Sequence, residues 1–180
     1  MTLVLKTVFA SMLLTTSMNL VGADEYRALD RIQTTNLRTA AKIGSVDGHD
    51  RYLMPAVIYQ ESKAGLDKKH QTFIGIGQVG FAAVREVLQE YPEVSSSCGG
   101  INHKSPKNVI RRAVQENDRC GITVASKYMV VIKEKYGISG EEHQVVAYQR
   151  GPIAGKKVKS SQYSKSVMRH KRNLKNLFKE

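Results

Sequence analysis

Residues 53–62 read LMPAVIYQES, and this stretch decides how the rest of the chain has to fold. Its apolar residues recur at the spacing of one helical face: Leu53, Met54, Val57 and Ile58. The pattern predicts a buried α-helix over about 51–63. Glu61 follows Ile58 by three residues and Val57 by four, so a carboxylate lies at the C-terminal end of the apolar stripe.

A carboxylate in that position has two interpretations. Removal from water favours its neutral form and raises its pKa, which would make Glu61 a proton donor for glycosidic cleavage. Alternatively, Glu61 extends past Lys63 into water, as most glutamates on helix flanks do. The stretch alone does not decide between them, and the residues downstream favour the proton donor.

Helical periodicity continues through most of the chain, and one glycine-rich segment interrupts it. Residues 70–80, HQTFIGIGQVG, are expected to be extended and irregular. Ser139 and Glu142 have the spacing of a capping box at the start of a helix, and Ser105-Pro106 is expected to open another. The other predicted helices cover about 24–42, 81–91, 118–136 and 161–178. The fold class predicted from pattern is a mainly α single domain.

The first 23 residues have the composition of an export signal. Lys6 is the only charged side chain before Asp24, an apolar run covers residues 8–14, and small residues at 21–23 suit a cleavage site. We therefore expect an exported protein, periplasmic or associated with the cell wall. An uncleaved anchor or a buried first helix is the alternative, but the polar residues that follow the apolar run argue against a membrane-spanning helix.

The chain has two cysteines, Cys98 in a glycine-rich loop and Cys120 near a predicted helix start. An even number in an exported chain permits one disulfide, and closing that loop would contribute about 3 kcal/mol. Two unrelated buried thiols are the alternative. No Cys-x-x-Cys pair and no histidine pair at helical spacing is present, so no metal site is predicted.

The charge balance indicates a polyanionic partner. There are 28 Lys and Arg residues against 16 Asp and Glu, a formal net charge of +12. Nucleic acid, an acidic membrane surface and an acidic polymer such as peptidoglycan all fit that charge. The basic stretch RHKRNLKNLFK at 169–179 contains no recognisable DNA-binding motif, and the export signal also argues against nucleic acid.

Two further segments carry groups that suit a sugar. In GIGQ, the glycines at 75 and 77 let backbone amides approach a ligand, and Gln78 can donate to and accept from sugar hydroxyls and acetamido groups. In AYQRG, residues 147–151, the ring of Tyr148 can pack on the core while its hydroxyl reaches a carboxyl group. Taken singly, a tight turn and an ordinary core tyrosine explain these segments as well.

Together and in this order, the segments resemble the soluble lytic transglycosylase family, which has a lysozyme-like fold. The resemblance covers roughly residues 45–175. Its elements are Glu61-Ser62, Gly75-Ile76-Gly77-Gln78, Asn117 with Gly121 and Tyr128-Met129, and Ala147-Tyr148-Gln149-Arg150-Gly151. Gly77 replaces a methionine of the family, which would leave a gap in the groove. Gln149 replaces an asparagine, which would lengthen a polar contact.

The resemblance implies a peptidoglycan lytic transglycosylase. Such enzymes cleave the β-1,4 bond between N-acetylmuramic acid and N-acetylglucosamine without water and leave 1,6-anhydro-N-acetylmuramic acid. By this resemblance Glu61 is first acid and then base and Tyr148 holds it, with no cofactor or metal. Ser62 and Gln78 would orient the carboxyl and the sugar. The other substrate-binding residues implied are Gly75, Gly77 and Gln149.

The expected organisation is an export signal over 1–23, an N-terminal helical segment over 24–44 and a lytic transglycosylase-like catalytic domain over 45–180. We expect a monomer that acts on peptidoglycan glycan strands. An exported enzyme of this kind would suit a secretion, conjugation or phage assembly, each of which has to open the wall locally.

A lysozyme-type hydrolase on the same fold and a non-catalytic wall-binding module are the alternatives. A two-carboxylate glycosidase needs a second acid across the sugar. Between Glu61 and Gln78 the only candidate is Asp67, flanked by lysines in a polar loop. Glu86 and Glu141 are more distant in sequence, and either could supply the second acid, so the hydrolase stays an alternative.

Overall fold

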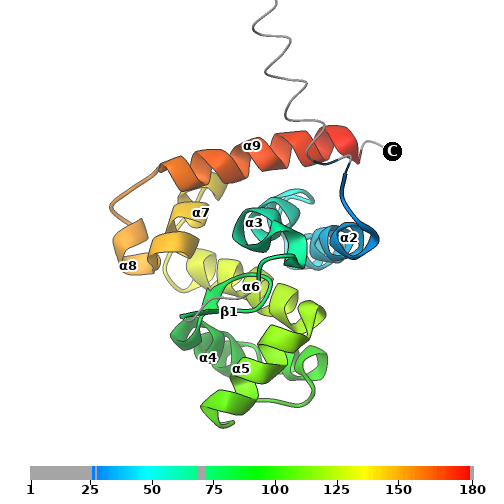
Figure 1. The fold of residues 1–180 in the computed structure, drawn as a ribbon. Helices are drawn as coiled ribbons and strands as arrows, with labels where there is room; N and C mark the ends of the chain where they lie inside the picture. Colours follow the sequence, from blue (N-terminus) through cyan, green and yellow to red (C-terminus); the bar gives the residue numbers. More distant parts are fainter. Residues whose placement is uncertain (1–25, 27, 69–71, 179–180) are drawn as a thin grey trace, which may run out of the picture.

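The computed structural model describes residues 26, 28–68 and 72–178 (Figure 1). The described chain is mainly helical, as predicted. The export signal predicted over 1–23 lies outside the described residues. In the part that is described, no helix combines the length and the apolar character needed to cross a bilayer.

Helix α3, Leu53–Ser62, is buried on nearly every side. All residues from Leu53 to Tyr59 are buried, whereas the sequence predicted burial along one stripe. A helix that is apolar all round belongs in the centre of a domain. Accordingly, α3 packs between α2, Arg31–Val46, and α9, Gln162–Leu177 (Figure 1).

A capping box sets the start of α2, seven residues later than predicted. The carboxylate of Asp30 accepts from the Gln33 backbone N–H at 2.7 Å, and the Gln33 side chain accepts from the Asp30 N–H at 3.0 Å. These bonds satisfy two of the free donors of the first turn. At the other end of the chain, Ser161 and Ser164 form a similar box that begins α9.

The remaining elements surround a second buried helix, α6, Asp118–Glu134. It packs against α2 and α7 on one side and against α4 and α5 on the other (Figure 1). Further helices are α4, Phe81–Glu90; α5, Lys107–Glu116; α7, Glu141–Arg150; and α8, Pro152–Gly155. The short 3-10 helices are η1, Lys63–Gly65, and η2, Pro92–Cys98.

The glycine-rich segment forms a small antiparallel hairpin, in agreement with the extended, irregular segment predicted there. Its strands are β1, Phe73–Ile74, and β2, Val79–Gly80. The turn needs a left-handed backbone at Gly75, with φ of 69°. A β-carbon on Gly75 would lie 2.4 Å from the Val114 carbonyl oxygen, so only glycine fits.

At two helix starts the predicted side-chain cap does not form, and each helix begins one residue later than expected. Helix α7 begins at Glu141 after Gly140, whose φ of 85° prevents the helix from reaching back to Ser139. Glu142 instead accepts from the hydroxyls of Ser160, at 2.7 Å, and Ser164, at 3.1 Å. Similarly, the Ser105 hydroxyl accepts from the Asn102 N–H and leaves α5 without a side-chain cap.

Cys98 and Cys120 are joined by a disulfide, which confirms the predicted pairing. The bond connects the end of η2 to the first turn of α6 across 22 residues of chain. Because it closes a loop, it restricts the unfolded chain more than the folded one.

We expect the Cys98→Ala/Cys120→Ala variant to lose about 3 kcal/mol of unfolding free energy, because the unfolded chain regains the freedom of that loop. Urea denaturation followed by circular dichroism measures the loss. The wild-type protein under reducing conditions should show the same decrease. Equal stability of the oxidised wild type and the variant would contradict a structural role for the bond.

Candidate active site

Glu61 lies in the last turn of α3 and lines a groove of about 660 Å³. The groove is formed by the end of α3, the hairpin, the start of α4, the end of α7 and the start of α9. Its floor and walls combine four aromatic rings with amide and guanidinium groups. The lining residues are Gln60, Glu61, Phe73, Gln78, Val79, Gly80, Ala82, Ala83, Tyr128, Tyr148, Gln149, Arg150, Gly151 and Tyr163.

The Glu61 carboxyl is half-buried and accepts a hydrogen bond from the Tyr163 hydroxyl. Burial raises its pKa to about 7, although the bond from Tyr163 lowers it in part. A carboxyl with that pKa is present in both protonation states near neutral pH. It can therefore donate a proton and later take one back.

Tyr148 is not the hydrogen-bond partner of Glu61 that the family resemblance implied. Its hydroxyl donates to the Gly77 carbonyl at 2.6 Å. The ring is buried in the groove wall, and burial and then the charge of Glu61 raise its pKa well above the usual value for tyrosine. Tyr148 thus borders the carboxyl, while Tyr163 holds it.

Ser62 is not among the residues that line the groove, and its hydroxyl is bonded to the backbone instead of to the carboxyl that it was expected to orient. Only 1 % of its surface is exposed. Its hydroxyl donates to the Ile58 carbonyl at 3.2 Å and accepts from the Gly65 N–H at 3.1 Å. The following residues, Lys63 and Ala64, have positive φ values of 51° and 58°. Ser62 therefore stabilises the sharp turn that ends α3.

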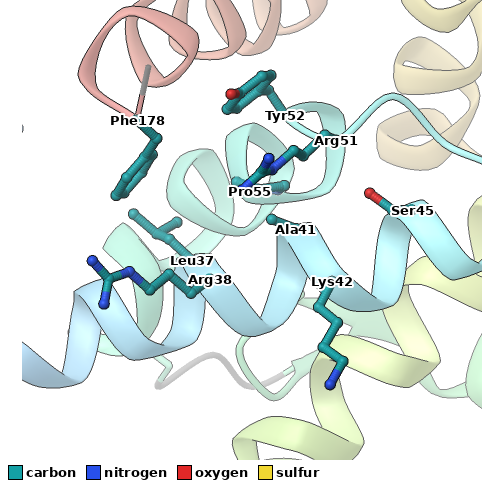
Figure 2. A pocket seen from close by; sticks show the side chains of 9 residues that line it. All are labelled: Leu37, Arg38, Ala41, Lys42, Ser45, Arg51, Tyr52, Pro55 and Phe178. Carbon is teal, nitrogen blue, oxygen red and sulfur yellow. The ribbon is translucent and has the colours of Figure 1, made fainter. Parts of the chain in front are cut away.

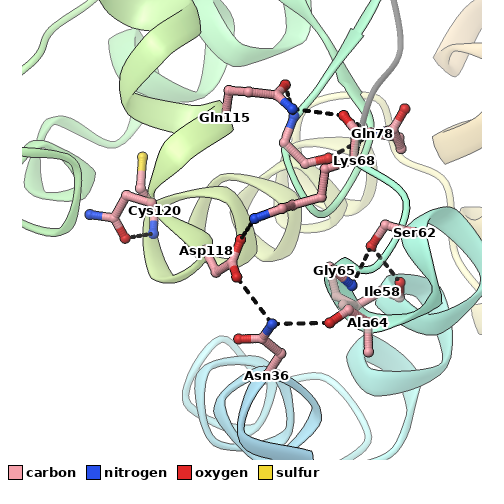
Figure 3. A network of polar contacts seen from close by, with 12 residues as sticks. Asn36, Ile58, Ser62, Ala64, Gly65, Lys68, Gln78, Gln115, Asp118 and Cys120 are labelled. Carbon is pink, nitrogen blue, oxygen red and sulfur yellow. Dashed lines mark hydrogen bonds and ion pairs between the residues drawn. The ribbon is translucent and has the colours of Figure 1, made fainter. Parts of the chain in front are cut away.

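A polar network fixes this turn against two other helices (Figure 3). The Asn36 amide of α2 donates to the Ala64 carbonyl at 3.0 Å and to the Asp118 carboxylate at 3.1 Å. Lys68 pairs with the same carboxylate at 2.8 Å. Since the turn directly follows Glu61, the network also limits the movement of the carboxyl.

Gln78 lines the groove, as predicted, and the same network holds its amide. The Nε2 atom donates to the Gly75 carbonyl at 2.8 Å and to the Lys68 carbonyl at 3.3 Å (Figure 3). Gln115 donates to the Lys68 carbonyl as well, at 2.7 Å. Gln78 is thereby placed with its amide oxygen as the atom that can accept from a ligand.

The predicted gap at Gly77 does not exist. A β-carbon at that position would come within 2.6 Å of the Ala125 β-carbon and 3.1 Å of the Tyr148 hydroxyl oxygen. The space is filled by the core, and Gly75 is packed in the same way. Of the four predicted substrate-binding residues, Gln78 and the exposed Gln149 line the groove, and the two glycines shape the turn behind it.

The sequence interpretation passed over several residues that line the groove, Tyr163 and Arg150 among them. Tyr163 lies four residues before Val167, on the buried stripe of α9 that continues to Leu174, so helical spacing was a signal for it. Arg150 occupies the variable position of the AYQRG segment. It is the only basic side chain among the described groove residues, and within the described chain it forms no ion pair.

Glu61 is the only carboxyl among the described residues that line the groove. Asp67 is exposed in the loop after η1. Glu86 pairs with Lys135 at 2.8 Å, and Glu141 pairs with Lys171 at 2.5 Å. None of these three acids faces Glu61 across the groove.

The described chain contains no group of three or more His, Cys, Asp or Glu side chains placed to bind a metal ion. No protein-family model matches the sequence, and neither a curated protein nor a solved structure matches it significantly. The chemistry of the groove therefore has to be argued from its own residues.

Replacing Glu61 by glutamine should change stability in a way that depends on pH. The pKa rises from 4.5 to about 7 on folding, so wild-type stability falls as pH increases through that interval. Glu61→Gln should therefore be about 3 kcal/mol more stable than the wild type above pH ~8, and equal to it below pH ~4. Denaturant unfolding at the two pH values measures this.

The matched control is Glu116→Gln, because Glu116 is an exposed glutamate outside the groove. It should show no such dependence on pH. A stability difference for Glu61→Gln that is the same at both pH values would contradict the raised pKa.

Removing the Tyr163 hydroxyl should raise the pKa of Glu61 further, because the bond from Tyr163 favours the carboxylate. We expect an increase of about one pH unit in Tyr163→Phe. Carbon-13 NMR of the side-chain carboxyl groups follows the titration. Tyr148→Phe is the control, since its hydroxyl binds Gly77 and its loss should leave the Glu61 pKa nearly unchanged. A larger increase in the Glu61 pKa in Tyr148→Phe than in Tyr163→Phe would show that Tyr148, and not Tyr163, holds the carboxyl.

Proposed function

We propose that the protein is a peptidoglycan lytic transglycosylase with a lysozyme-like fold, and that Glu61 carries both proton transfers. The observation that carries this proposal is the single half-buried carboxyl, with a pKa of about 7, in a groove lined by aromatic and amide groups. The order of the Glu-Ser, Gly-Ile-Gly-Gln and Ala-Tyr-Gln-Arg-Gly segments supports the same conclusion.

In the first step, the protonated Glu61 carboxyl gives its proton to the oxygen of the bond between N-acetylmuramic acid and N-acetylglucosamine. The bond from that oxygen to the anomeric carbon breaks, and positive charge develops on the muramoyl ring. In the second step, the Glu61 carboxylate takes the proton of the 6-hydroxyl of the same ring. The 6-oxygen then bonds to the anomeric carbon and closes the 1,6-anhydro product.

One carboxyl is sufficient for this sequence because the nucleophile belongs to the substrate. A hydrolase that works with two carboxyl groups needs a second acid on the other side of the sugar from Glu61. The described groove residues include no second acid, which supports the intramolecular route. A pKa near 7 suits both steps, since the group has to be a competent acid and then a competent base.

Tyr163 is a positioning residue in this proposal. Its hydroxyl donates to the carboxylate form of Glu61, so it steadies the charge that exists between the two proton transfers. Tyr148 supports the site indirectly, by holding the Gly77 carbonyl and thus the hairpin that forms one wall. Both tyrosines contribute without taking part in bond cleavage.

The remaining groove residues would bind the glycan. Gln78 and Gln149 offer amide groups to hydroxyl and acetamido groups, and Phe73 and Tyr128 offer ring faces to the apolar side of a sugar. Arg150 adds a positive charge that suits the carboxylates of the peptide attached to N-acetylmuramic acid. An exported monomer that acts on the wall, on behalf of a secretion, conjugation or phage assembly, fits this substrate.

The test is digestion of purified peptidoglycan with analysis of the products by mass spectrometry. We expect muropeptides that end in 1,6-anhydro-N-acetylmuramic acid. Glu61→Gln should lose activity by about a hundredfold or more, because the proton donor is missing. Glu116→Gln, which makes the same charge change outside the groove, should retain wild-type activity.

Each other outcome identifies an alternative. Reducing-end products in place of anhydro products would show a hydrolase. Binding to peptidoglycan without any cleavage would show a wall-binding module. Wild-type activity in Glu61→Gln would exclude Glu61 as the acid.

A further inference from the structure

A second pocket, of about 600 Å³, lies between α2, the start of α3 and the end of α9 (Figure 2). It shares no lining residue with the groove that contains Glu61. We call it the α2 pocket. Its lining residues are Leu37, Arg38, Ala41, Lys42, Ser45, Arg51, Tyr52, Pro55 and Phe178.

The floor of the α2 pocket is apolar. Leu37 and Pro55 are buried there, and Ala41 also lines the pocket (Figure 2). The ring of Phe178, at the end of α9, points toward Leu37, and the ring of Tyr52 lies on the other side. A concave apolar site flanked by two rings can take one large apolar side chain.

The rim of the α2 pocket is positively charged. Arg38, Lys42 and Arg51 are exposed, and no acid is among the described lining residues. The whole of α2, Arg31–Val46, contains no Asp or Glu. Within the described chain, neither Arg38 nor Lys42 forms an ion pair, whereas the Arg51 guanidinium lies over the Tyr52 ring at 5.9 Å.

We propose that the α2 pocket binds an acidic peptide segment of a partner protein, with one aromatic or large aliphatic side chain of that segment inserted between Tyr52 and Phe178. Charge complementarity is the main argument. Guanidinium groups bind carboxylates through two parallel hydrogen bonds, and two guanidinium groups border the pocket. The apolar floor adds a contact with an apolar side chain of the peptide, which a small free anion does not have.

The shape of the site favours a protein segment over a membrane surface. Membrane-bound helices insert projecting apolar side chains, whereas this site is hollow and receives a side chain from outside.

Binding at the α2 pocket would leave the groove open. Helix α3 connects the two sites, with Pro55 in its first turn and Glu61 in its last. A partner held at one end of α3 could therefore direct the protein to a place of action without covering the carboxyl. This inference does not depend on which reaction Glu61 performs.

The test uses fluorescence anisotropy with a labelled short peptide in which Asp and Glu flank one phenylalanine. Two matched peptides serve as controls: one has Asn and Gln in place of the acids, and the other has serine in place of the phenylalanine. We expect the first peptide to bind the full chain at physiological salt and both controls to bind more weakly. Equal binding of either control, or no binding of the first peptide, would overturn the proposal.

Two variants localise the binding. Arg38→Glu/Arg51→Glu should lower the affinity for the peptide by about tenfold or more. Lys165→Glu/Arg172→Glu makes the same charge change on the exposed face of α9 and should leave affinity nearly unchanged. Equal weakening by both pairs would show a general electrostatic attraction and contradict a specific site.

A third variant tests the anchor without a change in charge. Ala41→Trp fills the α2 pocket from a partly exposed helix position, so it should also lower the affinity for the peptide. The test therefore remains decisive even if the charge-reversed pair fails to fold. Circular dichroism confirms folding of each variant. Unchanged affinity in a folded Ala41→Trp variant would contradict the proposal. Vesicles of phosphatidylglycerol that bind the wild type, and lose binding in Arg38→Glu/Arg51→Glu, would reassign the site to membranes.

Discussion

The burial of α3 on nearly every side is the constraint on which the rest of the structure depends. A ten-residue helix with Leu53–Tyr59 fully enclosed can only sit at the centre, so α2 and α9 have to pack around it. Its last turn then emerges at the edge of the core. Glu61 is held at that edge, where burial raises its pKa to about 7 while the groove leaves it accessible.

Features that depend on local pattern could be predicted from the sequence. The apolar spacing of 53–62 predicted α3, and the glycines of 70–80 predicted a break in the helical chain. The spacing put Glu61 on the apolar stripe, and the downstream segments were needed to favour a half-buried carboxyl over one that extends into water. The number of cysteines and the expected export permitted a bond between Cys98 and Cys120, and the structure contains it. The lysozyme-like arrangement and the reaction remain proposals, because no known family or structure matches the chain.

Features that depend on how helices cross could not be predicted in the same way. The partner of Glu61 lies 102 residues away, and whether Tyr148 or Tyr163 reaches it depends on how α9 crosses α3. Ser62 was expected at the site because it follows Glu61 in the sequence. Adjacent residues of a helix point about 100° apart, and the Ser62 hydroxyl caps the end of α3 instead. Gly77 suggested an empty space, which Ala125 and Tyr148 fill from distant elements.

Tyr163, the residue that holds Glu61, comes from α9, the last helix of the described residues. A nascent chain in which α9 has not yet been made contains Glu61 but lacks Tyr163, which holds the carboxyl and lines the groove. The complete site therefore forms only after the chain has been synthesised through α9. Under the proposed function, a partly synthesised molecule would therefore carry an incomplete active site.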